Sequence, residues 1–293
     1  MRFLTAVPVY NEERSVEGVL KEVRRYSPEI LVVNDGSTDA TAEVIERAQG
    51  RATCAFTVVN QVNSGLAKGR NAGIARANGE RIIFIDDDVL PLPNFVEQHL
   101  RTSATHPASI VRGGAINVES FDDLPPPVWS IKDYSGNYFW TTNVSVPLAT
   151  IRAIGGFDES FSEYGWEDID VGLRLRLRGV RAVFNSKALV YHWKPRPRSA
   201  NVEKMVEQAR AQARTAVQLA KIHPHWRTYL ATGINPVQRA FHDVTRRFNF
   251  ADRFRRRVGD VSGDRALTDR ELRAARALAA EAYFEELESA LKA

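Results

Sequence analysis

The sequence predicts an α/β protein in which helices flank a mostly parallel sheet, followed by a helical C-terminal extension. Three observations predict this class. Short apolar runs alternate with segments of helical periodicity in the N-terminal part of the chain. Each of these early apolar runs ends in polar residues. From residue 201 onward the pattern is helical.

Four short apolar runs are predicted to be strands because they have the length and the bounding turn residues of buried strands. They are residues 3–9, 30–33, 56–59 and 81–85. Segments with apolar residues at helical spacing follow these runs in alternation. They are residues 15–26, 39–48, 67–77 and 93–105, and a further strand starts at 109–111. The alternation indicates strand–helix–strand units, which give parallel strands joined by right-handed crossovers.

Polar residues directly follow all four predicted strands. They are Tyr10 to Glu12, Asn34 with Asp35, Asn60 to Asn63, and Asp86 to Asp88. Parallel strands bring their carboxyl ends to one edge of a sheet, and ligands of open α/β sheets bind outside that edge. We therefore expect a polar ligand there, and a nucleotide is the commonest occupant.

The rest of the chain differs in composition. Residues 113–200 are richer in aromatic residues, Gly and Pro, and Leu124 to Pro127 is predicted to be a loop or rigid bend. Thr268 with Glu271 has the pattern of a capping box at a helix start. We divide the chain into a ligand-binding half of one domain, the second half of that domain, and a helical extension. These are residues 1–115, 116–200 and 201–293.

The composition is that of an ordinary globular protein, with 293 residues, 44% hydrophobic and 26% charged. Cys54 is the single cysteine, so no intrachain disulfide can form. The N-terminal apolar run is too short for a secretory signal and is interrupted by Pro8. No stretch of about 18 apolar residues occurs, so we expect no membrane span. We expect a cytoplasmic protein, with a peripheral contact to a membrane as an option.

Three aspartates, Asp86, Asp87 and Asp88, close the apolar run 82–85. Adjacent carboxylates repel one another, so at the end of a buried strand they favour a bound cation. A hard divalent ion such as Mn²⁺ or Mg²⁺ that also carries a diphosphate fits this requirement. In extended geometry Asp86 and Asp88 point the same way, so one can bind the metal while the other holds a ribose hydroxyl or a metal-bound water. The alternative is a solvated strand end.

Polar residues of two further segments are candidates for nucleotide contacts. Asp35 lies in the turn 33–39, where a carboxylate can accept from the ring N–H of uracil, thymine or guanine. Its alternative interpretation is a turn or helix-cap residue. Lys68, Arg70 and Asn71 lie near the start of the helix before the triple aspartate. They can contact a diphosphate, or they form an ordinary solvated helix start.

A second acidic cluster contains Trp166, Glu167 and Asp168. Its structural interpretation is a helix start, where carboxylates interact well with the helix dipole. Its functional interpretation is an acceptor site in which Trp166 covers a sugar face, Glu167 holds a hydroxyl and Asp168 takes the hydroxyl proton. Residues 171–178 alternate in polarity, which by itself predicts a strand. The pattern does not decide between helix and strand here.

His192 follows the apolar run 189–191. A histidine at a strand end is usually an ordinary surface or core residue. If its imidazole reaches the metal expected at Asp88, it supplies a nitrogen ligand for Mn²⁺. Lys194, Arg196 and Arg198, which follow shortly after it, are candidates to close over a diphosphate.

Together these residues resemble an inverting glycosyltransferase of family 2 with the GT-A fold. The resemblance extends over residues 3–198 and rests on the order and spacing of its motifs. The matching segments are 7–12, 33–39, 63–73, the DXD motif at 86–88, and 155–159 with 166–170. The last segment also resembles the C-terminal region of galactosyltransferases. The helical extension has no counterpart in this resemblance.

The resemblance implies a Rossmann-like domain with two halves. Its first half, residues 1–115, would bind the nucleotide sugar. Its second half, residues 116–200, would bind the acceptor and carry the catalytic base. The resemblance also implies that residues 173–178 continue a helix. In this scheme Tyr10 stacks on the base, Asp35 reads it and Asp168, beside Glu167, is the catalytic base. The further nucleotide-sugar contacts are Pro8, Glu12, Lys68, Arg70, Asn71, Asp86 and Asp87. The metal ligands are Asp88, Asp86 and, as in some relatives only, His192.

The predicted activity is transfer of a sugar from a nucleotide-diphosphate donor, with UDP favoured, to a hydroxyl of a saccharide, lipid-linked or other acceptor. Mn²⁺ or Mg²⁺ would neutralise the leaving diphosphate. A P-loop NTPase is excluded because no Gly-rich loop ends in Lys-Ser or Lys-Thr. A haloacid-dehalogenase-type phosphatase carries its aspartates after the first strand, whereas here they follow the fourth. A sugar nucleotidyltransferase and a catalytically degenerate sugar-nucleotide-binding or scaffold protein are the alternatives.

The net charge of +4 is concentrated in part at residues 245–258, which hold six Arg and one Asp. Phe248, Phe250 and Phe254 lie among these charges. The segment can lie on an anionic membrane, contact a partner subunit in a homo-oligomer, or form a solvated basic helix packed by its Phe residues. No nucleic-acid-binding module is recognised, so no nucleic-acid partner is expected.

Overall fold

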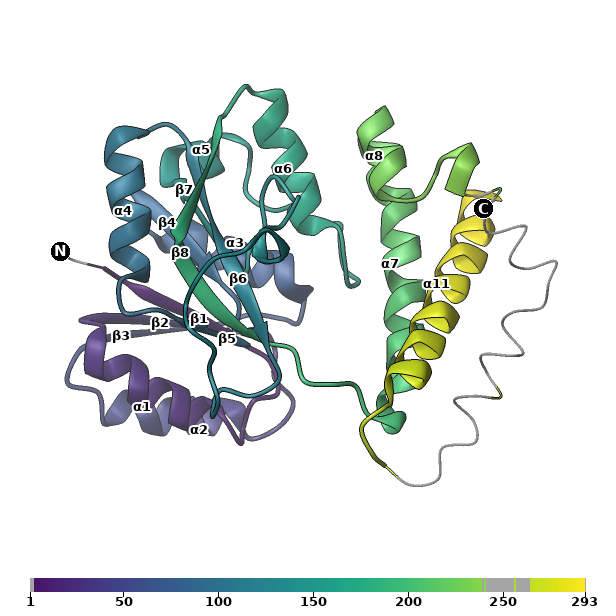
Figure 1. The fold of residues 1–293 in the computed structure, drawn as a ribbon. Coiled ribbons are helices and arrows are strands. Elements are labelled where there is room, and N and C mark those ends of the chain that lie inside the picture. Colours follow the sequence, from purple (N-terminus) through teal and green to yellow (C-terminus); the bar gives the residue numbers. More distant parts are fainter. Residues whose placement is uncertain (1–2, 239, 241–255, 257–263, 293) are drawn as a thin grey trace. The chain divides into compact units, whose positions relative to one another are not determined.

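The computed structural model describes residues 3–238, 240, 256 and 264–292 (Figure 1). The chain divides into two compact units. The first comprises Met1–Ile116, Pro127–Ser162 and Glu167–Tyr191. The second comprises Asn117–Pro126, Glu163–Trp166 and His192–Ala293. The second unit thus combines the C-terminal helices with two short segments from the middle of the chain, whereas the sequence suggested three consecutive parts.

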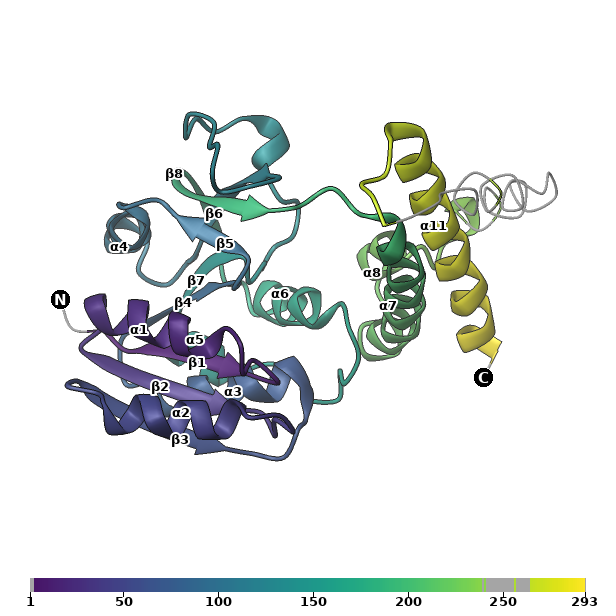
Figure 2. The same ribbon diagram turned by 90° about the horizontal axis from the view of Figure 1, so that it is seen from below.

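The first sheet is parallel, as the strand–helix alternation predicts. Its strands, in spatial order, are β1 (Thr5–Val9), β2 (Glu29–Asn34) and β3 (Ala55–Asn60). Helices α1 (Val16–Tyr26) and α2 (Thr41–Gly50) lie side by side on one face of this sheet (Figures 1 and 2). Their apolar sides bury Leu20 and Ile45 against Ile30 and Val32 of β2. Val9 pairs with Asn34, so the polar residues that follow β1 and β2 begin at the same level of the sheet.

The second sheet has five strands in the order β4–β7–β6–β8–β5. They are β4 (Arg81–Ile85), β5 (Val89–Pro91), β6 (Ile110–Val118), β7 (Asn143–Pro147) and β8 (Ala182–Trp193). Strand β7 is antiparallel to both β4 and β6. The expectation that the fourth predicted strand joins the first three is wrong, because β4 pairs with β7. Periodicity identifies a strand but carries no information about its partner.

The helices of the first unit beyond α2 complete its core. They are α3 (Gly65–Arg76), α4 (Phe95–Thr105), α5 (Leu148–Ala153) and α6 (Glu167–Leu177). The alternating stretch that by itself predicts a strand is the helix α6, as the family resemblance implied. Val171 and Leu175 lie one helical turn apart and are fully buried, whereas Glu167 and Asp168 stand in the first turn, where carboxylates interact favourably with the helix dipole.

The second unit is built on a pair of long helices, α7 (Val202–Ile222) and α11 (Asp269–Lys292), with the short α8 (Trp226–Ala231) (Figure 1). Ala213, Ala216 and Leu287 lie in the buried contact between the two long helices. The predicted capping box is confirmed, because the Thr268 N–H donates to Glu271 Oε2 (2.7 Å) and the Glu271 N–H donates to Thr268 Oγ1 (3.4 Å). The hydrogen bond from Arg265, with those from Thr268, lowers the pKa of Glu271 to about 2.

The sequence led to two expectations about membranes. Within the described part of the chain, none of the helices combines the length and the apolar character needed to cross a bilayer. The basic segment 245–258 lies outside the described residues apart from Arg256, so its predicted contact with a membrane or a partner subunit stays a prediction.

Candidate active site

The carboxyl end of β2 carries Asp35, a buried residue predicted to read the nucleotide base. Its carboxylate accepts hydrogen bonds from Gln61 Nε2 (2.7 Å) and from the backbone N–H groups of Ser64 (3.2 Å) and Gly65 (3.1 Å). Asp35 therefore binds backbone donors at the start of α3, a contact that differs from the local turn or helix-cap role weighed from the sequence. Lys68, in the first turn of α3, donates from Nζ to Ser64 Oγ (3.1 Å). The role of Asp35 in base reading stays a prediction.

The carboxyl end of β1 leads into Tyr10, predicted to stack on the base. Tyr10 is 47% exposed, so a ligand at this edge of the sheet can reach it. The Asp35 N–H donates to the Val9 carbonyl (2.9 Å), which brings the residues after β1 and β2 close together. Pro8 and Glu12, on either side, are also exposed. The structure thus groups the predicted base contacts at one edge of the parallel sheet.

The triple aspartate follows β4, and Asp87 and Asp88 form the turn into β5. Asp87 is exposed, whereas Asp86 and Asp88 are half-buried. Because Asp87 and Asp88 lie in a turn, the alternation of an extended strand does not account for this difference, and the predicted shared orientation of Asp86 and Asp88 stays a prediction. The Thr142 hydroxyl donates to Asp86 Oδ2, so Asp86 is held by the residue directly before β7.

The resemblance to family 2 implies a divalent metal, and the side chains of this motif can be compared with the ligands that such a metal prefers. Asp86 and Asp88 offer hard oxygen ligands, which suit Mg²⁺ and Mn²⁺. Within the described ranges no three His, Cys, Asp or Glu side chains are gathered so that they could hold a metal ion, and His192 therefore belongs to no such group. Mg²⁺ is commonly bound by one or two carboxylates together with substrate phosphates and water. The donor set fits a metal that arrives with a diphosphate.

Asp168 is the centre of a polar cluster built from α6, α3 and the turn before β7. Its Oδ2 accepts from the backbone N–H and from the hydroxyl of Thr141, both at 3.0 Å. Its Oδ1 is buried and has no hydrogen-bond partner among the described residues. Arg70, on α3, donates to Glu167 Oε1 (3.0 Å) and to Thr141 Oγ1 (3.4 Å). The guanidinium of Arg70 also lies over the ring of Phe157, 5.2 Å from its centroid.

The pKa of Asp168 is raised to about 6. Burial is the largest cause, because it disfavours the charged carboxylate. The positive charge of Arg70 opposes this rise, the negative charge of Glu167 adds to it, and the two hydrogen bonds from Thr141 oppose it. A carboxylate with a pKa near the working pH, one oxygen held and the other without a partner, is suited to accept a proton from a ligand.

Asn71 makes contacts other than the predicted one with a diphosphate. Its Nδ2 donates to the Phe157 carbonyl and to Glu159 Oε1, both at 2.9 Å, and its Oδ1 accepts from the Phe157 N–H (2.8 Å). Both donors of the amide are therefore used to hold the loop that begins at Gly156. A contact with a diphosphate would require one of these hydrogen bonds to break.

Trp166 lies in the second unit, although it directly precedes Glu167. Its Nε1 donates to the Gln212 carbonyl of α7 (2.7 Å), and its ring packs against the core between α7 and α11. These contacts anchor the indole, and its predicted contact with an acceptor sugar stays untested. His192 is buried near the end of β8.

Arg196 and Arg198, predicted to close over a diphosphate, make ion pairs with Asp269 and Asp264. All four residues belong to the second unit, where these pairs join the chain after β8 to the region at the start of α11. The candidate role at a diphosphate is therefore not supported by their contacts.

Sequence reasoning missed Thr141 and Thr142. The first holds the candidate base, and the hydroxyl of the second contacts the DXD motif. They are adjacent residues just before β7, a strand that periodicity did not identify. The one available signal is a pair of small hydroxyl residues followed by Asn143 after an aromatic run, and such a pair is too common to single out.

Comparison with known protein families matches residues 5–161 to glycosyl transferase family 2. The match covers more than half of the chain, and the chain therefore belongs to this family. It includes β1 to α5 and the triple aspartate but ends before α6. The resemblance of residues 166–170 to galactosyltransferases stays a prediction.

Individual relatives agree with this assignment. The chain is 27% identical over 215 residues to validoxylamine A glucosyltransferase of Streptomyces hygroscopicus subsp. limoneus, covering 59% of this chain and 48% of that protein. The chain thus spans about half the length of the curated relatives it matches.

Two solved structures share the fold. The mannosyltransferase PcManGT from Pyrobaculum calidifontis, in complex with GDP-Man and Mn²⁺, has a TM-score of 0.58 at 16% identity, over 98% of this chain and 87% of that chain. GalNAc-T7 with UDP, GalNAc and Mn²⁺ has a TM-score of 0.58 at 13% identity, over 75% of this chain and 48% of that chain. At these identities the similarity concerns the fold alone. The predicted GT-A-type α/β fold is confirmed.

Proposed function

We propose that this protein transfers a sugar from a nucleoside-diphosphate sugar to an acceptor hydroxyl, with inversion at the anomeric carbon and Asp168 as the general base. One observation carries the proposal. Asp168 has a pKa of about 6, one oxygen held by Thr141, and a second oxygen that is buried without a partner among the described residues. A buried acceptor without a hydrogen bond is costly, and an acceptor hydroxyl would supply the missing donor.

The chain's own residues have distinct tasks in this mechanism. Asp168 Oδ1 accepts the proton of the acceptor hydroxyl, so that the oxygen can attack from the face opposite the leaving diphosphate. Thr141 orients the carboxylate through Oδ2. Arg70 forms an ion pair with Glu167. Its positive charge also limits the rise in the pKa of Asp168, which keeps a fraction of the base ionised near neutral pH.

The donor would lie at the carboxyl ends of β1 and β2 and beside the triple aspartate. Tyr10, which is exposed, would stack on the base, and Asp35 would read it. A divalent metal bound by Asp88 and Asp86 would neutralise the leaving diphosphate. UDP is our choice of nucleotide, since GalNAc-T7, which has the same fold, is described with UDP and Mn²⁺, although PcManGT is described with GDP-Man.

The test is release of nucleoside diphosphate from a panel of UDP- and GDP-sugars, with and without Mn²⁺. We expect metal-dependent release that increases with a suitable acceptor. Asp168→Asn should lower transfer by roughly 10²–10⁴-fold while nucleotide binding, measured by calorimetry, is retained. Asp123→Asn, an exposed position, is the control. Full transfer by Asp168→Asn removes this residue from the role, and binding without turnover for every donor favours a sugar-nucleotide-binding protein.

A further inference from the structure

The segment Glu163–Trp166 belongs to the second unit and runs directly into α6, whose second residue is Asp168. We infer that α7 and α11 hold this segment and thereby place the first turn of α6, so that Arg214 is a positioning residue for the base. The inference rests on the proposed role of Asp168. It assigns a task to the helical extension, for which the sequence offered none.

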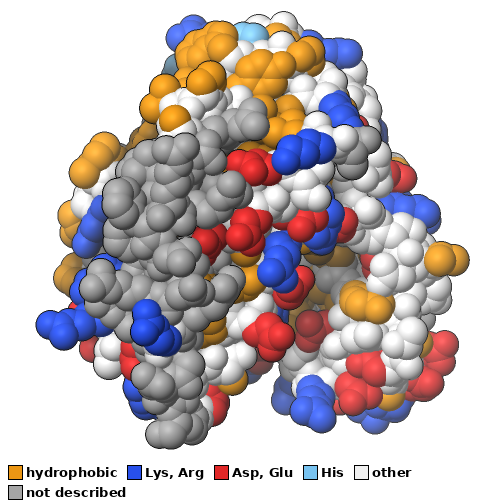
Figure 3. All heavy atoms as spheres, turned by 90° about the vertical axis from the view of Figure 1, so that its right-hand side faces the viewer, with side chains coloured by type: hydrophobic (Ala, Val, Ile, Leu, Met, Phe, Trp, Pro, Cys, Tyr) orange, Lys and Arg blue, Asp and Glu red, His pale blue; other side chains and the backbone are white. Residues whose placement is uncertain are grey.

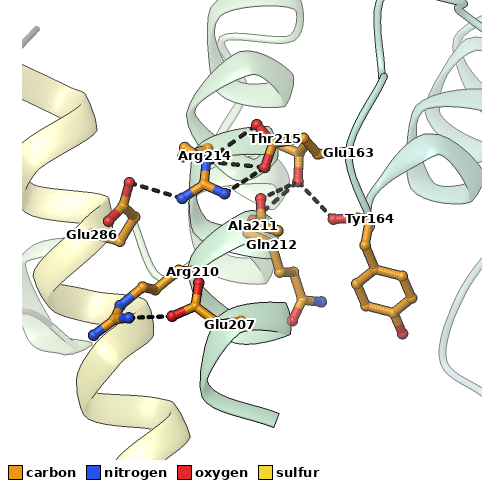
Figure 4. Close-up of polar contacts among 9 residues, drawn as sticks. All are labelled: Glu163, Tyr164, Glu207, Arg210, Ala211, Gln212, Arg214, Thr215 and Glu286. Atoms are coloured by element: carbon orange, nitrogen blue, oxygen red, sulfur yellow. Dashed lines mark hydrogen bonds and ion pairs between the residues drawn. The ribbon is translucent and has the colours of Figure 1, made fainter. Parts of the chain in front are cut away.

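The tether between the segment and the helices is centred on Arg214 of α7 (Figure 4). Its Nε donates to both carboxylate oxygens of Glu163, at 3.1 and 3.0 Å, and its Nη2 also contacts Glu163. Its Nη1 donates to Glu286 Oε1 of α11 (3.1 Å). One guanidinium therefore connects the segment to both long helices. A planar fork of donors that grips a carboxylate through several bonds holds it in orientation as well as in distance.

Further contacts hold the rest of the segment against α7. The Thr215 hydroxyl donates to the Tyr164 carbonyl (3.2 Å), as Figure 4 shows. Trp166 Nε1 donates to the Gln212 carbonyl (2.7 Å). Each of the last three residues of the segment thus meets α7, since a Cβ added to Gly165 would lie 3.0 Å from the Gln212 side chain.

The backbone of the segment is strained just before α6. Gly165 has φ = 109° and Trp166 has φ = 68°. The left-handed region is open to glycine, but a bulky aromatic residue adopts it at a cost and keeps it only where its surroundings impose it. The anchored indole of Trp166 is that constraint. The residue directly before α6 is therefore held by α7.

The chain offers a matched control for Arg214. Arg210 lies one turn earlier on α7 and pairs with Glu207 of the same helix (Figure 4). Both arginine side chains are 40% exposed. Figure 3 shows acidic and basic side chains interspersed on the face turned toward the viewer. Arg210→Gln removes a charge and an ion pair but leaves the segment tethered.

The experiment compares Arg214→Gln with Arg210→Gln in the full chain. We expect Arg214→Gln to lower kcat for transfer by about ten-fold, because a small displacement of a catalytic group is costly, with the donor KM within about twofold of the wild type. Glu163→Gln should reproduce the loss, and the double variant should be no worse than either single variant. Arg214→Lys should restore part of kcat. Arg210→Gln should behave as the wild type.

A second readout does not depend on activity. Amide hydrogen exchange of residues 163–170 should be faster in Arg214→Gln and Glu163→Gln than in Arg210→Gln. If the wild type transfers no sugar, the proposed function fails, but the exchange data still test the tether. Equal exchange of this segment in all variants, or an equal loss of kcat in Arg214→Gln and Arg210→Gln, overturns the inference. Faster exchange with unchanged kcat overturns the positioning role.

Discussion

Thr141 and Asp168 are joined by two hydrogen bonds to a single oxygen, since both the N–H and the hydroxyl of Thr141 donate to Asp168 Oδ2 at 3.0 Å. The pair links the chain just before β7 to the first turn of α6. With Oδ2 held in this way, Oδ1 is the oxygen left to receive a proton. The electrostatics of the site can therefore be tested by changing the residues around Asp168 while the carboxylate itself stays in place.

Thr141→Val should shift the pH dependence of transfer. The hydroxyl of Thr141 stabilises the ionised carboxylate, so its loss raises the pKa of Asp168 further above its ordinary value. The base form then appears at higher pH, and the acid limb of kcat/KM should move upward by about one pH unit. Thr141→Ser keeps the donor and should leave the limb near pH 6. If the acid limb of kcat/KM lies at the same pH in Thr141→Val as in the wild type, the assignment of Asp168 as the titrating base is contradicted.

Arg70→Gln should shift the same limb in the same direction. The positive charge of Arg70 favours the ionised form of Asp168, so its removal raises the pKa of that carboxyl and lowers the fraction of base at pH 7. The matched control is Arg76→Gln, since Arg76 lies on the same helix and donates to the Ala72 carbonyl (3.4 Å). Profiles of kcat/KM against pH for both variants are the measurement. Equal pH profiles for the two variants would show that Arg70 does not influence the pKa of the catalytic base.

Gly156→Ala should destabilise the protein by more than Gly155→Ala. Both glycines have positive φ, 73° and 82°, so both substitutions strain the backbone. A Cβ at residue 156 would also lie 2.4 Å from Asn71 Oδ1, whereas a Cβ at residue 155 meets no atom within 4 Å. We expect a difference of about 1–3 kcal/mol in the free energy of unfolding, measured with urea. Equal losses would mean that Asn71 gives way without cost.

Asp88→Asn should raise the Mn²⁺ concentration required for half-maximal transfer by at least about tenfold, because a charged oxygen ligand is replaced by a neutral one. Asp87→Asn, an exposed neighbour in the same motif, is the control and should change this concentration little. A manganese titration at saturating donor distinguishes the two variants. If Asp87→Asn has the larger effect, the assignment of Asp88 as the metal ligand is wrong.

Much of the fold could be predicted from the sequence because local patterns record local structure. The parallel β1–β3 sheet, its covering helices and the capping box at Thr268 all followed from periodicity and short-range chemistry. The partner of β4 did not, since strand pairing joins residues that are distant in sequence. Helix α6 shows this limit of local patterns most clearly. The alternation of residues 171–178 favoured a strand, and only the resemblance to family 2 implied a helix.

The sequence by itself determined which residue types are available for chemistry and in what order they follow the strands, and so it led to Asp86, Asp88 and Asp168. Only the tertiary structure decided their environment: that Thr141 holds Asp168, that Arg70 faces Glu167, and that Trp166 is anchored to α7. The physical reason is that the pKa and orientation of a side chain depend on burial and on partners supplied by distant segments, which no local pattern encodes.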